Sequence, residues 1–90
     1  MSDSPEATLL EFPCRFPIKM MGRDGERFRR AAIELVELHA GKIPDESIRV
    51  AASRKGNFLS ITVTIDATSQ AQLDRIYQAL SDHDEILVAL

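Results

Sequence analysis

The sequence has few of the residues that catalysis and metal binding usually require: one cysteine, two histidines and no tryptophan among 90 residues. Cys14 cannot form an internal disulfide because there is no second cysteine, a usage typical of a reducing compartment. Cys14, His39 and His83 are far apart in the sequence and have no spacing typical of metal ligands. No histidine adjoins Cys14 to act as its base. We therefore expect no metal, no cofactor and no enzymatic activity.

Long apolar stretches are also missing. No apolar run approaches the roughly 20 residues that a membrane-spanning helix requires, and the first residues lack the basic start and apolar stretch of a signal peptide. We therefore expect a cytoplasmic protein that does not bind membranes. Residues 1–8 are small, polar and without periodicity, so we expect a flexible tail before a single domain at residues 9–90.

Charge is unevenly distributed along the chain. The net charge of −3 argues against a general nucleic-acid-binding protein. The basic residues of the first third are Arg15, Lys19, Arg23, Arg27, Arg29 and Arg30, and the acidic residues near the end are Asp66, Asp74, Asp82, Asp84 and Glu85. This order predicts a molecule with a basic side and an acidic side.

The first strand is expected at residues 16–21. Pro13 and Pro17 exclude a helix in this region and favour an extended chain. The residues expected to share one face of the strand are Phe16, Ile18 and Met20.

The first helix is expected at residues 26–39, after a turn at residues 22–25 in which Asp24 caps the helix. Gly41 and Pro44 end this helix. The residues expected on its buried stripe are Phe28, Ala31, Ala32, Leu35, Val36 and Leu38.

A hairpin follows the first helix. Residues 47–52 alternate in polarity as a half-buried strand does. Residues 58–65 are rich in β-branched side chains and alternate more clearly still. The core face of this second strand consists of Leu59, Ile61, Val63 and Ile65, and its other face of Phe58, Ser60, Thr62 and Thr64.

Ser69 and Gln72 form a capping-box pattern that starts a second helix, which ends near Leu80. Residues 85–90 supply the last strand. The order βαββαβ predicts an α+β, ferredoxin-like sandwich, in which a four-stranded antiparallel sheet carries two helices on one face.

Several segments together are typical of one known family: Leu10-Glu11-Phe12-Pro13, Met21-Gly22, Ser53-Arg54-Lys55-Gly56-Asn57-Phe58, Ser60, Ile65-Asp66-Ala67-Thr68 and Ile76-Tyr77. From about Leu10 to Leu90 the chain resembles the YbeD-like family of small uncharacterised bacterial proteins with an ACT-like, ferredoxin-like fold. The resemblance implies a relation to amino-acid-sensing regulatory domains and a regulatory role, and it supplies no established activity.

The turn at residues 22–25 is the first candidate site. It joins a strand to a helix, and the N–H groups at the start of a helix favour anions. The resemblance to ACT domains implies that an amino-acid ligand meets Asp24 and Gly25 there. The predicted site for a small anionic, amino-acid-like metabolite consists of Gly22, Arg23, Asp24 and Gly25. The alternative is a tight turn that only supports the fold.

The early arginines are the second candidate. Arg27 and Arg30 lie near the positive end of the first helix, where a cation costs roughly 0.3–1 kcal/mol, so we expect them to serve an anionic partner. With Arg54 and Lys55 of the hairpin turn they predict a contact surface for an acidic protein.

The sheet face that carries the hydroxyl groups suggests two further partners. The segment at residues 54–58 resembles the basic-glycine-aromatic pattern of the RNA-recognition motif, but Phe58 is the one aromatic residue available for stacking, so RNA is the least favoured partner. Lys19 and Arg49 share this face with the hydroxyl groups, and a face of this kind on so small a domain predicts a homodimer.

Overall fold

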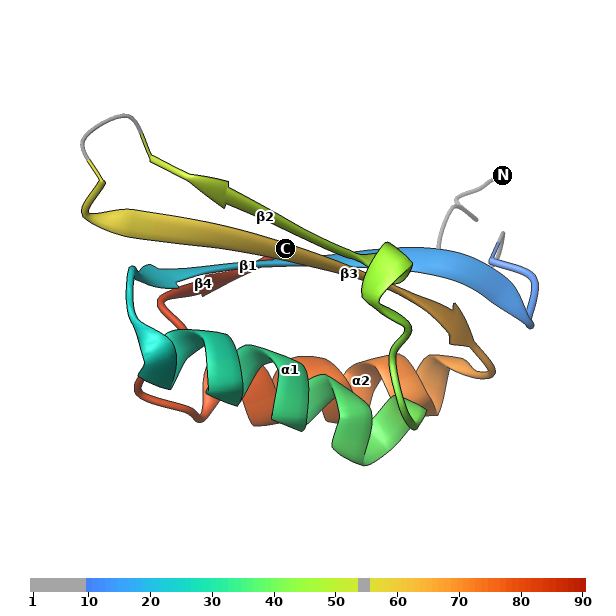
Figure 1. Cartoon of the computed structure of the whole chain (residues 1–90). Helices are drawn as coiled ribbons and strands as arrows, with labels where there is room; N and C mark the ends of the chain where they lie inside the picture. Colours follow the sequence, from blue (N-terminus) through green and yellow to red (C-terminus); the bar gives the residue numbers. More distant parts are fainter. Residues whose placement is uncertain (1–9, 54–55) are drawn as a thin grey trace, which may run out of the picture.

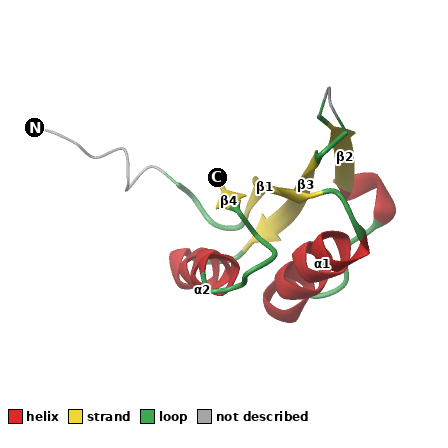
Figure 2. Ribbon diagram, turned by 90° about the vertical axis from the view of Figure 1, so that its left-hand side faces the viewer, coloured by secondary structure: helices red, strands yellow, loops and turns green. Residues whose placement is uncertain are grey.

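The computed structural model describes residues 10–53 and 56–90, so the tail predicted at residues 1–8 lies outside the described residues. The elements are β1 (Cys14–Arg23), α1 (Glu26–Ala40), the short 3-10 helix η2 (Asp45–Ser47), β2 (Ile48–Ala52), β3 (Phe58–Ala67), α2 (Gln70–Ser81) and β4 (Val88–Ala89). The strands form one antiparallel sheet in the order β2-β3-β1-β4. Both helices lie on the same side of this sheet (Figures 1 and 2). The predicted ferredoxin-like order of elements is confirmed.

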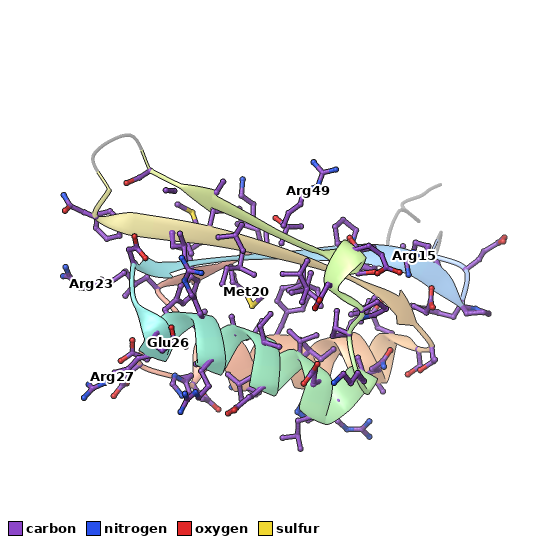
Figure 3. The ribbon with its side chains drawn as sticks, in the orientation of Figure 1. Arg15, Met20, Arg23, Glu26, Arg27 and Arg49 are labelled. Carbon is purple, nitrogen blue, oxygen red and sulfur yellow. The ribbon has the colours of Figure 1, made fainter. Side chains whose placement is uncertain are left out.

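The core lies between the sheet and the helices. The alternating apolar side chains of β1 and β3 form the part of the core that the sheet contributes. Successive side chains of a strand point to opposite faces, so the apolar residues at every second position all turn toward the helices. Met20 illustrates this, because its side chain lies between the sheet and the helix layer (Figure 3). The buried side chains of the two strands include Ile18, Met20, Leu59, Ile61, Val63 and Ile65, and those of the helices include Phe28, Val36, Leu73, Ile76 and Leu80.

Helix α1 begins at Glu26, as predicted, but its cap lies one residue later than expected. Gly25 is the N-cap and no side chain bonds to the first turn, so the prediction that Asp24 caps the helix is wrong. The backbone N–H of Asp24 donates to the carbonyl of Asn57 at 3.1 Å, and its carboxylate turns to Arg29 at 3.9 Å. The predicted end of the helix is confirmed, because Gly41 at φ 81 terminates it.

Leu38 does not belong to the buried stripe of α1, contrary to the prediction. Its side chain is 74% exposed, whereas Val36 is fully buried. Two residues of an α-helix turn through about 200°, so a residue two positions after Val36 lies on the opposite side of the helix. The other predicted members of the stripe are buried, with Leu35 partly so.

Strand β2 is exposed along most of its length, so the expected half-buried strand is wrong. Val50 faces the helix side of the sheet, opposite Ile61, yet it is 48% exposed while Ile61 is 1% exposed. The cause lies in the helix layer: α1 packs against β3 and β1, and α2 against β4 and β3. Figure 1 shows β2 rising away from the helix layer toward its Ala52 end, which leaves this edge strand uncovered.

The last strand is shorter than the predicted residues 85–90. The chain turns after α2, where the N–H of His83 donates to the carbonyl of Leu80 at 3.2 Å and the N–H of Ile86 to that of His83 at 3.1 Å. The second of these bonds uses the N–H of Ile86 in the turn, and the first backbone bond from the segment to β1 comes from the N–H of Leu87, which donates to the carbonyl of Met21 at 2.8 Å. Leu90 and Lys19 still exchange backbone hydrogen bonds of 2.8 and 3.2 Å beside β4.

The Ser69 cap predicted for α2 is present, and the reciprocal bond of the Gln72 side chain goes to Thr68, one residue before the cap. The N–H of Gln72 donates to the Ser69 Oγ at 3.1 Å, and the Gln72 side chain accepts from the N–H of Thr68 at 2.8 Å and donates to the carbonyl of His39 at 3.0 Å. The same glutamine therefore links the start of α2 to the end of α1.

We expect Ser69→Ala to lower the free energy of unfolding by about 1 kcal/mol, because an N–H in the first turn of α2 loses its acceptor. Urea denaturation followed by circular dichroism measures this loss. Ser81→Ala, at the exposed end of the same helix, is the matched control and should change stability by less than about 0.5 kcal/mol. Equal effects of the two substitutions would contradict the role given to the cap.

Candidate functional site

The four residues of the first candidate site lie in different surroundings. Gly22 and Arg23 belong to β1, and Gly22 is buried. A Cβ at Gly22 would overlap the ring of Phe28 and lie 2.6 Å from the carbonyl oxygen of Glu85, so this glycine permits close packing. Arg23 lies with its guanidinium 5.8 Å from the centre of the Phe58 ring. That these residues bind a ligand stays a prediction.

Arg27 and Arg30 line an open cavity of about 380 Å³ between α1 and the turn that precedes β4. Its other charged or titratable lining residues are Glu26, Glu34, His83 and Glu85. Three carboxylates therefore face two guanidinium groups, and a purely anionic ligand would meet an excess of like charge. This mixture also departs from the expected separation into a basic and an acidic side, because early arginines and a late glutamate share one cavity. The other two predicted contacts, Arg54 and Lys55, lie outside the described residues.

The side of the sheet opposite the helices, called here the open face, carries a row of cations. Arg15, Lys19 and Arg23 occur at every fourth position of β1 and so lie on one face. Arg49 of β2 joins them, and Figure 3 shows its side chain on the side of the sheet away from the helices. The opposite face of β1 is the buried one, so none of the four cations competes with the core.

Among the strand residues of the open face, Asp66 is the one carboxylate. Four cations and one carboxylate give this face a net charge of +3. Arg15 pairs with Asp66 at 3.1 Å, and both side chains are largely exposed. An exposed pair of this kind stabilises the fold by less than about 1 kcal/mol. The other three cations of the open face, Lys19, Arg23 and Arg49, are not part of that ion pair.

The strand register places Lys19 and Arg49 in one row, because each lies opposite Thr62 of the strand between them. Neighbouring strands are about 4.8 Å apart, so the backbones of the two cations are separated by about 10 Å. The next row along the sheet contains Ala51, Ser60, Met21 and Val88. Met21 is 36% and Val88 42% exposed, which places an apolar strip beside the cations.

Tyr77 of α2, in the helix layer, is hydrogen-bonded to the backbone of Leu90 beside β4. Its hydroxyl donates to the carbonyl oxygen of Leu90 at 2.7 Å, and burial raises the pKa of that hydroxyl. Tyr77 also lines a second cavity, of about 340 Å³, between α2 and the residues around β4. Its lining residues are Tyr77, Leu80, Ser81, Ile86, Leu87 and Ala89, and none of these side chains is charged.

The sequence interpretation placed Lys19 and Arg49 on the open face but did not join Arg15 and Arg23 to them. The missing signal was the length of β1, which was expected at residues 16–21 and spans Cys14–Arg23. The cavity beside α1 was also missed, because Glu85 and His83 reach it only through the turn after α2.

Within residues 10–53 and 56–90, the side chains of histidine, cysteine, aspartate and glutamate form no group of three that could hold a metal ion. In the same part of the chain, neither helix is long and apolar enough to cross a membrane.

The fold and the open face define a small α+β domain of ferredoxin-like topology with an uncovered basic sheet face. The chain belongs to the family described as "Protein of unknown function (DUF493)", whose family model matches residues 7–90. The UPF0250 protein NE1487 of Nitrosomonas europaea is 44% identical over 85 residues, which cover 94% of this chain and 98% of the relative. A UPF0250 protein of Chromobacterium violaceum is 40% identical over 90 residues and covers both chains completely. The resemblance to YbeD-like proteins is confirmed.

A solved structure supports the fold. The solution structure of protein HP0495 from H. pylori matches with a TM-score of 0.65, covering 97% of this chain and 93% of that chain. The two sequences are 17% identical, so this likeness concerns the fold alone.

Proposed function

We propose that the domain is a non-enzymatic, cytoplasmic interaction module that docks an acidic protein surface through the open face of its sheet. The observation that carries this proposal is the uncovered face itself, where Lys19, Arg23 and Arg49 lie beside the exposed apolar side chains of Met21 and Val88. Protein interfaces combine an apolar centre with charged groups around it that select and orient the partner.

The charge of the whole chain supports this orientation. The chain carries −3 and the open face +3, counted above from its strand residues, so the remaining residues together carry −6. An acidic partner is attracted to the open face and repelled by the rest of the molecule. Such a distribution steers encounter and lowers the number of wrong orientations.

A protein partner fits this face better than RNA. Proteins that bind single-stranded RNA stack bases on several aromatic side chains, whereas Phe58 is the one aromatic residue on the strands of this face and Arg23 lies over its ring. The positions that follow it on the same face of β3 are Ser60, Thr62 and Thr64. These short side chains suit hydrogen bonds and close contact with a protein surface.

A second candidate function is the sensing of a small amino-acid-like metabolite near the start of α1. The cavity that contains Arg27 and Arg30 favours it, because two guanidinium groups can hold a carboxylate and the nearby carboxylates can hold an ammonium group. In this regulatory alternative the ligand lies one turn beyond the predicted residues 22–25.

We expect Lys19→Glu with Arg49→Glu to weaken the binding of a soluble glutamate-rich peptide containing two leucines by about tenfold or more, which corresponds to about 1.4 kcal/mol. The reason is that both charges at the centre of the open face are reversed. Nuclear magnetic resonance titration at low salt measures the affinity and maps the perturbed amides. Rising ionic strength should weaken wild-type binding, because exposed charges are screened.

The matched control is Arg27→Glu with Arg30→Glu, which reverses two charges on α1 and should leave peptide affinity within about twofold. If this control variant alone lost peptide binding, the binding site would lie on the basic face of α1 and not on the open face. Tighter binding of single-stranded RNA than of the peptide at the open face would overturn the protein proposal. Saturable binding of a free amino acid at the α1 cavity, with no response to the peptide, would favour the sensor.

A further inference from the structure

Strand β2 is an outer strand of the sheet, with β3 on one side only. Four of its five residues are exposed, and Ile48 is half-buried. Edge strands of soluble proteins commonly carry prolines, bulges or inward-pointing charges that prevent pairing with another chain. The helix-side residues of β2 are Ile48, Val50 and Ala52, and none of them is charged.

The backbone groups of β2 that point outward follow from its pairing with β3. The N–H of Ser53 donates to the carbonyl of Phe58 at 2.9 Å. In an antiparallel pair the residues that bond to the neighbouring strand alternate, so Arg49 and Ala51 also bond toward β3. The N–H and C=O groups of Ile48, Val50 and Ala52 therefore point to the outer edge.

The same three residues combine outward backbone groups with apolar side chains on the helix side of the sheet. Val50 lies at their centre, and its side chain is 48% exposed because the helices pack beneath β1, β3 and β4. An added strand at this edge would satisfy the backbone groups and remove apolar surface from water in one step.

We propose that β2 pairs with β2 of a second copy of this chain, antiparallel about a two-fold axis at Val50. In this register Val50 lies opposite Val50 of the partner subunit, and Ile48 lies opposite Ala52 of the partner subunit. Each of these opposed pairs can exchange two N–H···O bonds. The side chains of Val50, Ile48 and Ala52 then meet their counterparts on the helix side.

Charge selects this register over its neighbours. When the two-fold axis lies at Val50, Arg49 faces Ala51 of the partner subunit, so no like charges are directly opposed. If the axis lay at Arg49, the two guanidinium groups would lie directly opposite one another, which is destabilising. If the axis lay at Ala51, Ile48 would extend past the partner strand, and one of the hydrogen-bonded residue pairs would be lost.

The pairing is separate from the proposed docking of an acidic partner, since it uses the edge of the sheet and leaves the open face uncovered. It joins two sheets into one continuous sheet with both open faces on the same side. A partner with two acidic segments would then gain from the high local concentration of the second site.

Sedimentation equilibrium over a range of concentrations tests the dimer. We expect reversible association of the wild-type chain and at least a tenfold weaker association for Val50→Lys, because two lysines would meet at the axis. Val50→Pro should have the same effect, since it removes an outward N–H without breaking a bond to β3. Leu38→Lys, which introduces the same charge at another exposed apolar position, should associate like the wild type.

Hydrogen exchange supplies a second measurement that does not depend on a variant. The amide of Val50 should become more protected as protein concentration rises, while the amide of Met21 on β1 should not change. A chain that stays monomeric at every concentration overturns the proposal. So does a dimer that Val88→Lys dissociates and Val50→Lys does not, because that result places the interface on the open face.

Discussion

Replacing Gly22 with alanine is expected to lower the free energy of unfolding by about 1–3 kcal/mol, the usual cost of overpacking a core. The added methyl group would overlap the ring of Phe28 and approach the carbonyl oxygen of Glu85 at 2.6 Å. The ring is fully buried and the carbonyl is backbone, so neither can move without disturbing the core or the turn before β4. Denaturation by urea, followed by circular dichroism, measures the loss.

Gly25→Ala is the matched control for this prediction. No atom lies within 4 Å of a Cβ at Gly25, and its φ of 163° is an extended conformation that any residue adopts. We expect this variant to remain within about 0.5 kcal/mol of the wild type. If Gly22→Ala were equally harmless, the close approach of Phe28 and Glu85 to β1 would be disproved.

Replacing Phe28 with alanine is expected to cost about 3–5 kcal/mol, the largest effect of any single substitution considered. Phe28 heads the fully buried side chains by volume, and its removal leaves a cavity between α1 and β1. A 90-residue domain has a total stability of about 5–13 kcal/mol, so the variant should unfold at a much lower urea concentration. Leu38→Ala, at a side chain that is 74% exposed, is the control on the same helix.

The two core substitutions should not be additive. In a Phe28→Ala background the ring that opposes a methyl group at Gly22 is absent, so Gly22→Ala should cost less than it does alone. A full, additive cost in the double variant would assign the strain to the Glu85 carbonyl alone. A small effect of Phe28→Ala would instead contradict the packing of α1 on β1.

The alternation of β1 and β3 was sufficient to predict which of their side chains enter the core. A period of two is a local property of the chain, so Ile18 and Met20 could be assigned to the core before any tertiary contact was known. The exposure of Val50 could not be predicted in this way. Its alternation is that of a half-buried strand, and only the placement of the helices leaves it uncovered.

The candidate surfaces likewise divide into residues that a local pattern could place and residues that only the tertiary fold brings together. Lys19 and Arg49 could be placed together on the open face, because each belongs to a predicted strand of clear polarity pattern. The meeting of Arg27 and Arg30 with Glu85 depends on the turn after α2, which joins residues far apart in the sequence. The hydrogen bonds of that turn, among Leu80, His83 and Ile86, are not encoded in a periodic pattern, so the start of the last strand could not be predicted either.

The hydrogen bond from Tyr77 to Leu90 has an optical consequence. Tyr77 is the one tyrosine of a chain without tryptophan, so near-ultraviolet emission originates at the seam between α2 and the residues beside β4. Its hydroxyl lies 2.7 Å from the Leu90 carbonyl oxygen, and separation of the two would change the polarity around the phenol. The intrinsic fluorescence of the protein therefore reports the detachment of β4 from α2, and it carries no direct signal from the edge of β2.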